Sequence, residues 1–210
     1  MGPDSSVHPH SPQPRDKSSE SATCDRADAA SQPPRSASLA ELPTSDLIDR
    51  FAIGVENFDR RVLDLTNPEL DTAFRPESGA GRWPARVLLG HLAEAEIVFV
   101  HRMRRTVAED APLLALFDEN ACIDCGRLYG TPETGHLHPV GAFVAAIHTM
   151  RAWTAPWLRT LDAAHLARRA LHPERGEITV RSILEYSTWH LEHHAWFLRK
   201  KLDRLRPPPA

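Results

Sequence analysis

The sequence of 210 residues has few cysteines and no long apolar run. Three cysteines are too few for a disulfide framework, and their odd number points the same way. No apolar stretch approaches the roughly 20 residues that span a bilayer, and the first thirty residues lack the apolar centre of a secretory signal. We therefore expect a cytoplasmic protein without a membrane-spanning segment.

The sequence also lacks an excess of charge of either sign. Its 25 Lys and Arg residues and 28 Asp and Glu residues give a formal net charge of −3. Proteins that hold nucleic acid or an anionic membrane by bulk electrostatics carry a cationic excess. The composition therefore predicts neither a nucleic-acid partner nor a membrane partner, and it leaves an enzyme open.

Large aliphatic side chains are almost missing from residues 1–38, which contain Val7 alone of this kind. The same stretch holds six of the 18 prolines and nine serines. Such a segment cannot bury enough apolar surface to offset the entropy lost on ordering. The sequence thus predicts a disordered Pro/Ser-rich tail over residues 1–38, a folded domain over 39–206 and a Pro-rich end over 207–210.

Helical periodicity dominates the predicted domain, and no sustained alternation typical of strands occurs. Four stretches show it: residues 45–65, 84–108, 140–161 and 179–205. A long connection over 109–139 is predicted to hold a short helix near 113–117, and residues 172–176 are predicted to form a loop. Four amphipathic helices of this length predict an all-α fold, a four-helix bundle. The long connections allow helices that follow one another in the chain to lie apart.

Two of the 12 histidines, His190 and His194, stand four residues apart on the last predicted helix. This spacing puts them about 40° apart on one face, one turn above the other. The pair flanks the apolar stripe of the helix, so it borders the core, whereas His193 lies further from the stripe. His190 and His194 are therefore candidate ligands of one metal ion, and His193 is an outer or exposed residue.

The second predicted helix offers a third ligand, because His91 also flanks an apolar stripe. Three histidines from two helices would leave coordination positions open for water or substrate, which is typical of a catalytic site. Zinc, nickel, iron or manganese would suit such a set. The alternative is that the HxxxH spacing is a surface coincidence in a histidine-rich chain.

Two further residues are candidate catalytic groups. Glu94 lies one turn from His91 and could orient an imidazole or a bound water. Tyr186 lies one turn before His190 and could donate a hydrogen bond into the pocket. The alternatives are a solvated carboxylate and a packed core tyrosine.

The cysteines offer a competing site in the long connection. Cys122 and Cys125, together with His136 and His138, could hold a structural zinc ion. The spacing between the two pairs is shorter than in the usual zinc fingers. The alternative interpretation is that Cys122 and Cys125 are two reduced thiols in a loop.

Two stretches resemble the signatures of the DinB-like superfamily. They are residues 81–96, around His91, and residues 189–194, which read Trp-His-Leu-Glu-His-His. Residues 46–51 and 172–179 are similar to the same group, and the resemblance covers about residues 42–203. It implies a four-helix bundle that binds a divalent metal ion through three histidines, here His91, His190 and His194.

The resemblance also bears on function. It implies a metal-dependent hydrolase or a thiol-dependent S-transferase that takes a small-molecule substrate and, for the second, a low-molecular-weight thiol. A non-catalytic metal-binding or stress-response bundle is the alternative, and a scaffold without metal would require the three histidines to be accidental. Bundles with exposed apolar flanks often pair, so a homodimer is an expectation as well.

Overall fold

The computed structural model describes residues 32–131 and 133–207, and residues from Pro34 onward belong to one compact unit. The predicted disordered tail therefore lies outside the described residues up to residue 31. A short helix, α2 (Ala37–Ala40), already occupies the last two tail positions, and its Leu39 is buried. Of the Pro-rich end, residues 208–210 also lie outside the described part.

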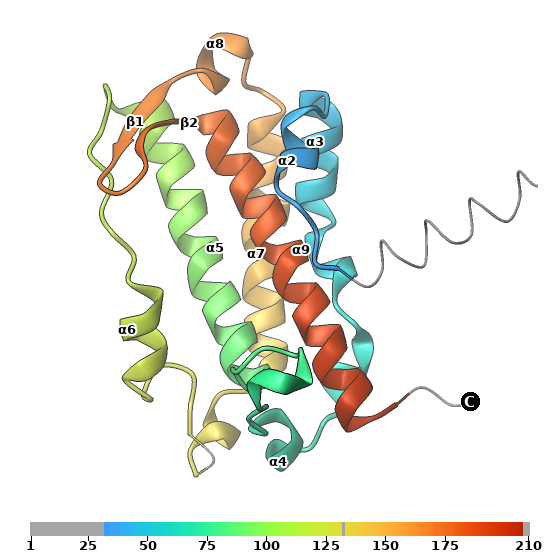
Figure 1. The fold of residues 1–210 in the computed structure, drawn as a ribbon. Coiled ribbons are helices and arrows are strands. Elements are labelled where there is room, and N and C mark those ends of the chain that lie inside the picture. Colours follow the sequence, from blue (N-terminus) through green and yellow to red (C-terminus); the bar gives the residue numbers. More distant parts are fainter. Residues whose placement is uncertain (1–31, 132, 208–210) are drawn as a thin grey trace, which may run out of the picture. The chain divides into compact units, whose positions relative to one another are not determined.

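Four helices form a bundle, as the sequence predicted (Figure 1). They are α3 (Thr44–Ala52), α5 (Ala85–Ala108), α7 (Val140–Leu158) and α9 (Val180–Leu205). Helix α5 packs against α7 and α9, and α3 packs against the same two helices. Consecutive helices are thus not always neighbours, because α3 and α5 face each other across the bundle. Within the described ranges, no helix has both the length and the apolar composition needed to cross a membrane.

The helix starts follow local signals in the sequence. Pro84 directly precedes α5, and Pro139 directly precedes α7. At the start of a helix, the missing N–H of proline costs no helical hydrogen bond. The side chain of Thr179 caps α9 by accepting a hydrogen bond from the Ser182 N–H, as its position predicted. Pro156 lies in the last turn of α7, which ends at Leu158.

The prediction of a helix over residues 45–65 is wrong for the second half of that range. Helix α3 ends at Ala52, and two 3₁₀ turns follow, Gly54–Asn57 and Arg60–Asp64. The reason is the side chain of Arg151 from α7. It donates to the carbonyl oxygen of Phe51 at 2.9 Å, and it fills the space that a β-carbon on Gly54 would need. The α-helix therefore ends, although the later apolar residues still reach the core.

The connection between α5 and α7 also differs from the prediction. Residues 113–117 are extended, and Leu113 pairs with Leu171 in a single parallel bridge. The short helix, α6 (Glu119–Asp124), begins later because Asp118 caps it by accepting from the Ala121 N–H. The 3₁₀ turn Gly135–Leu137 lies near the end of this connection. Two further short elements, helix α4 (Asn67–Leu70) and the 3₁₀ turn Pro76–Ser78, precede α5.

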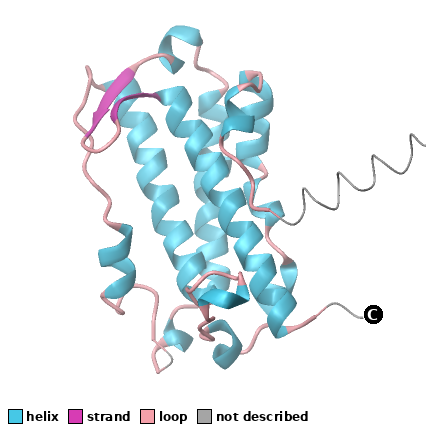
Figure 2. Ribbon diagram, in the orientation of Figure 1, coloured by secondary structure: helices cyan, strands magenta, loops and turns pink. Residues whose placement is uncertain are grey.

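The predicted loop at residues 172–176 forms the turn of a β-hairpin, whose strands the sequence did not predict (Figure 2). The hairpin follows the short helix α8 (Ala163–Leu166) and consists of β1 (Arg169–His172) and β2 (Gly176–Thr179). The strands are antiparallel, with Arg169 opposite Thr179 and His172 opposite Gly176. Four residues per strand are too few to show a period of two, so the sequence pattern could not reveal them.

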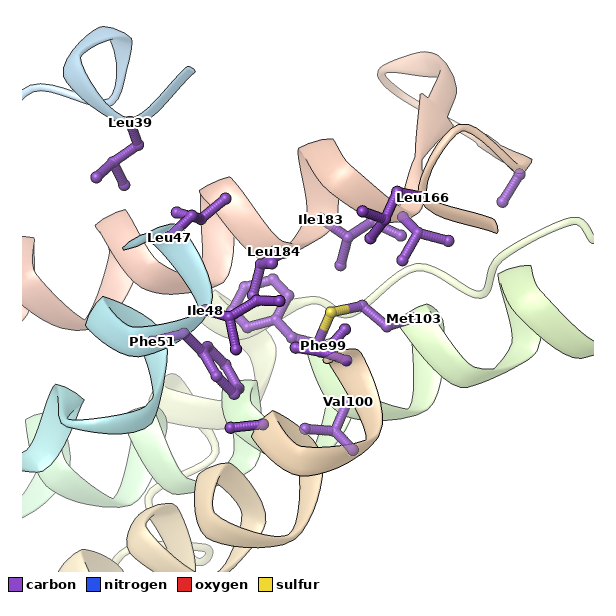
Figure 3. Close-up of a cluster of buried hydrophobic side chains, with 14 of the residues drawn as sticks. Leu39, Leu47, Ile48, Phe51, Phe99, Val100, Met103, Leu166, Ile183 and Leu184 are labelled. Carbon is purple, nitrogen blue, oxygen red and sulfur yellow. The ribbon is translucent and has the colours of Figure 1, made fainter. Parts of the chain in front are cut away.

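The core consists of two apolar clusters. One fills the end of the bundle next to the hairpin, where side chains from α3, α5 and α9 point toward one another (Figure 3). The other fills the opposite end and includes Leu88, Leu191 and Leu198. Between the two clusters, the buried positions of α5, α7 and α9 carry polar side chains, among them Glu96, Arg151 and His190.

Candidate metal centre

Helices α5 and α9 bring His91, His190 and His194 together at the edge of this polar layer. One nitrogen from each ring lies within 4.8 Å of the other two. His91 is fully buried, His190 is 6% exposed and His194 is half-buried. Helical spacing explains the pair on α9, and the packing of α5 against α9 supplies the third ring.

The ring geometry fits a shared cation. The Nε2 atoms of His91 and His190 are 3.2 Å apart. Two nitrogens that each lie about 2.1 Å from one cation are separated by roughly 3.0 to 3.4 Å at angles between 90° and 109°. The observed separation falls within that range, so these two imidazoles can bind one ion without moving apart.

Burial keeps the three imidazoles neutral. It lowers the pKa of His91 to about 4 and, together with the neighbouring histidines, the pKa of His194 to about 3. The pKa of His190 is also lowered, chiefly by burial and then by the charge that His194 and His91 would carry. Neutral imidazole is the form that ligates a metal ion.

Aromatic rings, and not hydrogen bonds to Nδ1, orient two of the three imidazoles. The Nδ1 atoms of His91 and His194 are buried and have no hydrogen-bond partner. Instead, the Trp83 ring lies 5.3 Å from the His91 ring and 5.9 Å from that of His194, and Phe117 stacks on His91 at 6.4 Å. Metal-ligating histidines usually donate their second N–H to a carboxylate or carbonyl. Ring packing takes that orienting role here.

A pocket of about 330 Å³ opens beside His190. The extended segment before α6 forms one wall and α5 forms another, while Tyr186 and the hairpin turn complete it. An adjoining pocket of about 300 Å³ shares five lining residues with it: Phe99, Arg102, His172, Arg175 and Tyr186. A small molecule in this space would lie against His190.

The two predicted catalytic residues have different surroundings. Tyr186 lines both pockets, and its ring stacks on His190 at 5.9 Å between centroids. Glu94 is half-buried, and its carboxylate accepts a hydrogen bond from the Tyr129 hydroxyl. Tyr186 is therefore next to the candidate metal centre and the pocket. The Glu94 carboxylate instead binds Tyr129, which belongs to the α5–α7 connection.

Sequence reasoning missed Tyr129, which is buried against α5. Its ring fills the space where a β-carbon on Gly90 would stand, next to His91 in the chain. Burial, and then the hydrogen bond to Glu94, raise its pKa. Tyr129 thus fastens the connection to the helix that carries His91, and the only sequence signal for this was a glycine inside a helix.

The structure does not bring the cysteines and their neighbouring histidines into a second metal site. In the part of the chain that is described, the three bundle histidines are the one group of three or more ligating side chains with donor atoms this close. The Cys125 thiol donates to the Cys122 carbonyl at 3.1 Å, within its own helical turn. Burial raises the pKa of the Cys122 thiol, so this group stays protonated.

The chain is similar to proteins named as metal-dependent hydrolases. The chain is 26% identical over 155 residues to the "Putative metal-dependent hydrolase OB0782" of Oceanobacillus iheyensis, covering 72% of this chain and 83% of that protein. It is 30% identical over 131 residues to the "Putative metal-dependent hydrolase YfiT" of Bacillus subtilis, covering 62% and 67% of the two chains.

The solved structure of Bacillus subtilis YfiT, described as having an unusual four-helix bundle topology, has the same fold. It superposes with a TM-score of 0.66 at 22% identity, covering 83% of this chain and 93% of that one. The protein-family model of the DinB superfamily matches residues 37–198 of this chain, and this range includes all three histidines. The chain belongs to the DinB superfamily.

Proposed function

We propose that the protein binds one divalent metal ion through His91, His190 and His194 and acts as a metal-dependent hydrolase on a small molecule. The convergence of three neutral imidazoles, of which His190 lines a pocket, carries this proposal. Three neutral ligands leave the charge of the cation uncompensated and leave positions open for other ligands.

A divalent cation at this place would supply Lewis acidity and would lower the pKa of a bound water or thiol. The protein supplies orientation. Trp83 and Phe117 fix the imidazole rings, while Tyr186 and Phe99 place aromatic surface between His190 and the rest of the pocket. The Tyr186 hydroxyl is the group that we expect to donate a hydrogen bond to the substrate.

Glu94 takes a positioning role in this proposal. Its carboxylate holds the Tyr129 hydroxyl, and Tyr129 packs against the helical turn that contains His91. The pair thereby keeps the α5–α7 connection, including Phe117, over the candidate metal centre.

Metal analysis of protein purified without a histidine tag tests the first half of the proposal. We expect near one metal ion per chain after incubation with zinc, nickel, iron(II) or manganese(II). His190→Ala should lose the ion, whereas His193→Ala, a matched change on the same helix outside the group of three, should retain it. Equal metal content in both variants would contradict the assigned ligands.

Turnover assays with metal-loaded protein test the second half. Esters and amides should be hydrolysed without added thiol, and activity should disappear in His190→Ala and fall in Tyr186→Phe. Turnover that requires a low-molecular-weight thiol would assign an S-transferase in place of a hydrolase. Bound metal without turnover under either condition would favour a non-catalytic metal-binding protein.

A further inference from the structure

The hairpin turn between β1 and β2 contains Arg175, whose guanidinium group lines the pocket. The Cζ atom of Arg175 lies 4.0 Å from the centroid of the Tyr186 ring, and that ring also neighbours His190, at 5.9 Å between centroids. Among the described residues, no hydrogen bond or ion pair involves the Arg175 guanidinium, so its donors are available to a ligand.

A second guanidinium and an imidazole line the same space. Arg102 of α5 is half-buried and donates to the carbonyl oxygen of Ala115 at 2.8 Å, which uses one of its five N–H groups. His172 is buried, and its Nδ1 accepts the Glu174 N–H at 3.2 Å. The neutral ring therefore carries its proton on Nε2, where it can donate.

The region that the two pockets share has no counter-charge. Of its five lining residues, two are guanidinium groups, one is an imidazole and none is a carboxylate. Burial, and then the neighbouring charge of Arg175, lower the pKa of Arg102. Two like charges close together are unfavourable unless an anion lies between or beside them.

The carboxylates around the pockets lie outside the region that the two pockets share. Glu185 is already paired with Arg181 at 2.6 Å, and Asp118 accepts the Ala121 N–H at the start of α6. Glu119 and Glu174 are exposed and line the second pocket alone. The region that the two pockets share is therefore lined by cationic and aromatic side chains and by no carboxylate.

We propose that Arg102, Arg175 and His172 form an anion subsite beside the metal centre, and that the substrate carries a carboxylate or phosphate group in addition to the group that reacts at the metal. The second part of this inference rests on the proposed function; the first part does not. Arginine suits the role because its planar fork pairs with both kinds of oxyanion. The Tyr186 ring separates the subsite from His190, which sets the length of a small molecule that could reach both.

Titration of the zinc-loaded full chain, followed by NMR chemical shifts, tests the subsite. The probes are succinate, inorganic phosphate and the neutral analogue succinamide. We expect one of the anions to bind and to weaken with rising salt, and succinamide to bind much less. Arg175→Gln should weaken anion binding roughly tenfold to hundredfold, as expected for lost hydrogen bonds to a charged group.

Arg169→Gln is the matched control. Arg169 lies in the same hairpin but is exposed, pairs with Glu177 at 2.6 Å and lines neither of these two pockets. The Arg169→Gln variant should bind the anions with the affinity of the unmodified chain. The Arg102→Gln variant should weaken anion binding as Arg175→Gln does. Equal binding of succinamide, or unchanged anion affinity in both pocket variants, would overturn the inference.

The metal content of each sample separates the two proposals. Anion binding that depends on Arg175 in a protein that takes up no metal would retain the subsite and reject the metal function. Full metal content without anion binding would retain the metal site and reject the anion subsite. Preference for succinate or for phosphate decides which oxyanion the substrate carries.

Discussion

Two buried polar groups lie next to each other in the bundle and meet their hydrogen-bonding needs differently. Arg151 is fully buried, and it donates to Glu96 at 2.8 Å and to the carbonyl oxygens of Phe51 and Ser187 at 2.9 and 3.0 Å. The histidine group, one turn or so away along α5 and α9, keeps buried nitrogen atoms without a partner.

The difference separates a structural group from the group that we propose to bind a metal ion. The guanidinium of Arg151 joins α3, α5, α7 and α9 through hydrogen bonds that lie entirely within the protein, and in this group the Oε1 atom of Glu96 stays without a partner. The three histidines each place one nitrogen within 4.8 Å of the other two, close enough for all three to bind one cation. Because Glu96 and Ser187 sit on the helices that carry the histidines, the Arg151 group also sets where these rings meet. The following experiments test this distinction.

The largest change in stability should come from Arg151→Ala. It would leave Glu96 buried without its cation, and breaking such a pair typically costs about 3–5 kcal/mol in the free energy of unfolding. Burial already raises the pKa of Glu96. Urea unfolding of metal-free protein measures the effect. Arg159→Ala, which removes an exposed pair with Asp49 at 2.6 Å, should cost no more than about 1 kcal/mol. Equal losses would show that the buried group is not structural.

Metal addition should stabilise the protein through the histidine group alone. At a free metal concentration of about 100 times Kd, the free energy of unfolding should rise by about 2.7 kcal/mol. Urea unfolding with metal and with a chelator measures the difference. His190→Ala should lose the response and His193→Ala should keep it. A response in His190→Ala equal to that of the unmodified chain would place the metal elsewhere.

Lys201 is an intermediate case, a buried amine that donates to the carbonyl oxygens of Ala80 and Gly81. Burial lowers its pKa from 10.5 to about 8. Between these values the unfolded chain binds a proton that the folded chain lacks, so the free energy of unfolding rises with pH, by up to about 1.4 kcal/mol per pH unit.

The measurement compares urea unfolding of the unmodified chain and Lys201→Met from about pH 8 to about pH 10. The difference in unfolding free energy should shift in favour of the unmodified chain as pH rises. Lys200→Met, at the neighbouring position, should follow the unmodified chain. A difference that stays constant with pH would mean that the Lys201 amine titrates alike in both states.

The smallest effect should follow loss of ring packing around the histidines. Trp83→Leu removes the ring next to His91 and His194, and changes around metal ligands typically reduce affinity about tenfold or more. Competition with a chromophoric chelator measures the metal Kd. Trp153→Leu, which changes a tryptophan that is 56% exposed on α7, is the control. Unchanged affinity in Trp83→Leu would mean that backbone position alone orients the imidazoles.

The fold and the histidine group were predictable because their signals are local. Helical periodicity revealed α5, α7 and α9, and a four-residue spacing put His190 and His194 on one face. The end of α3 was not predictable, because the cause is Arg151, which lies far along the chain from Phe51 and Gly54. Arg102 and Arg175 come from different elements, so only the folded chain shows that they share a pocket.

The close approach of Arg151 to Gly54 constrains how this protein can be redesigned. An engineer who wished to extend α3 by placing alanine at position 54 would have to shorten the side chain at position 151 in the same step. That change would in turn require an uncharged residue in place of Glu96, its ion-pair partner at 2.8 Å. Three positions on three separate segments are therefore coupled, and a library for this region has to vary them together.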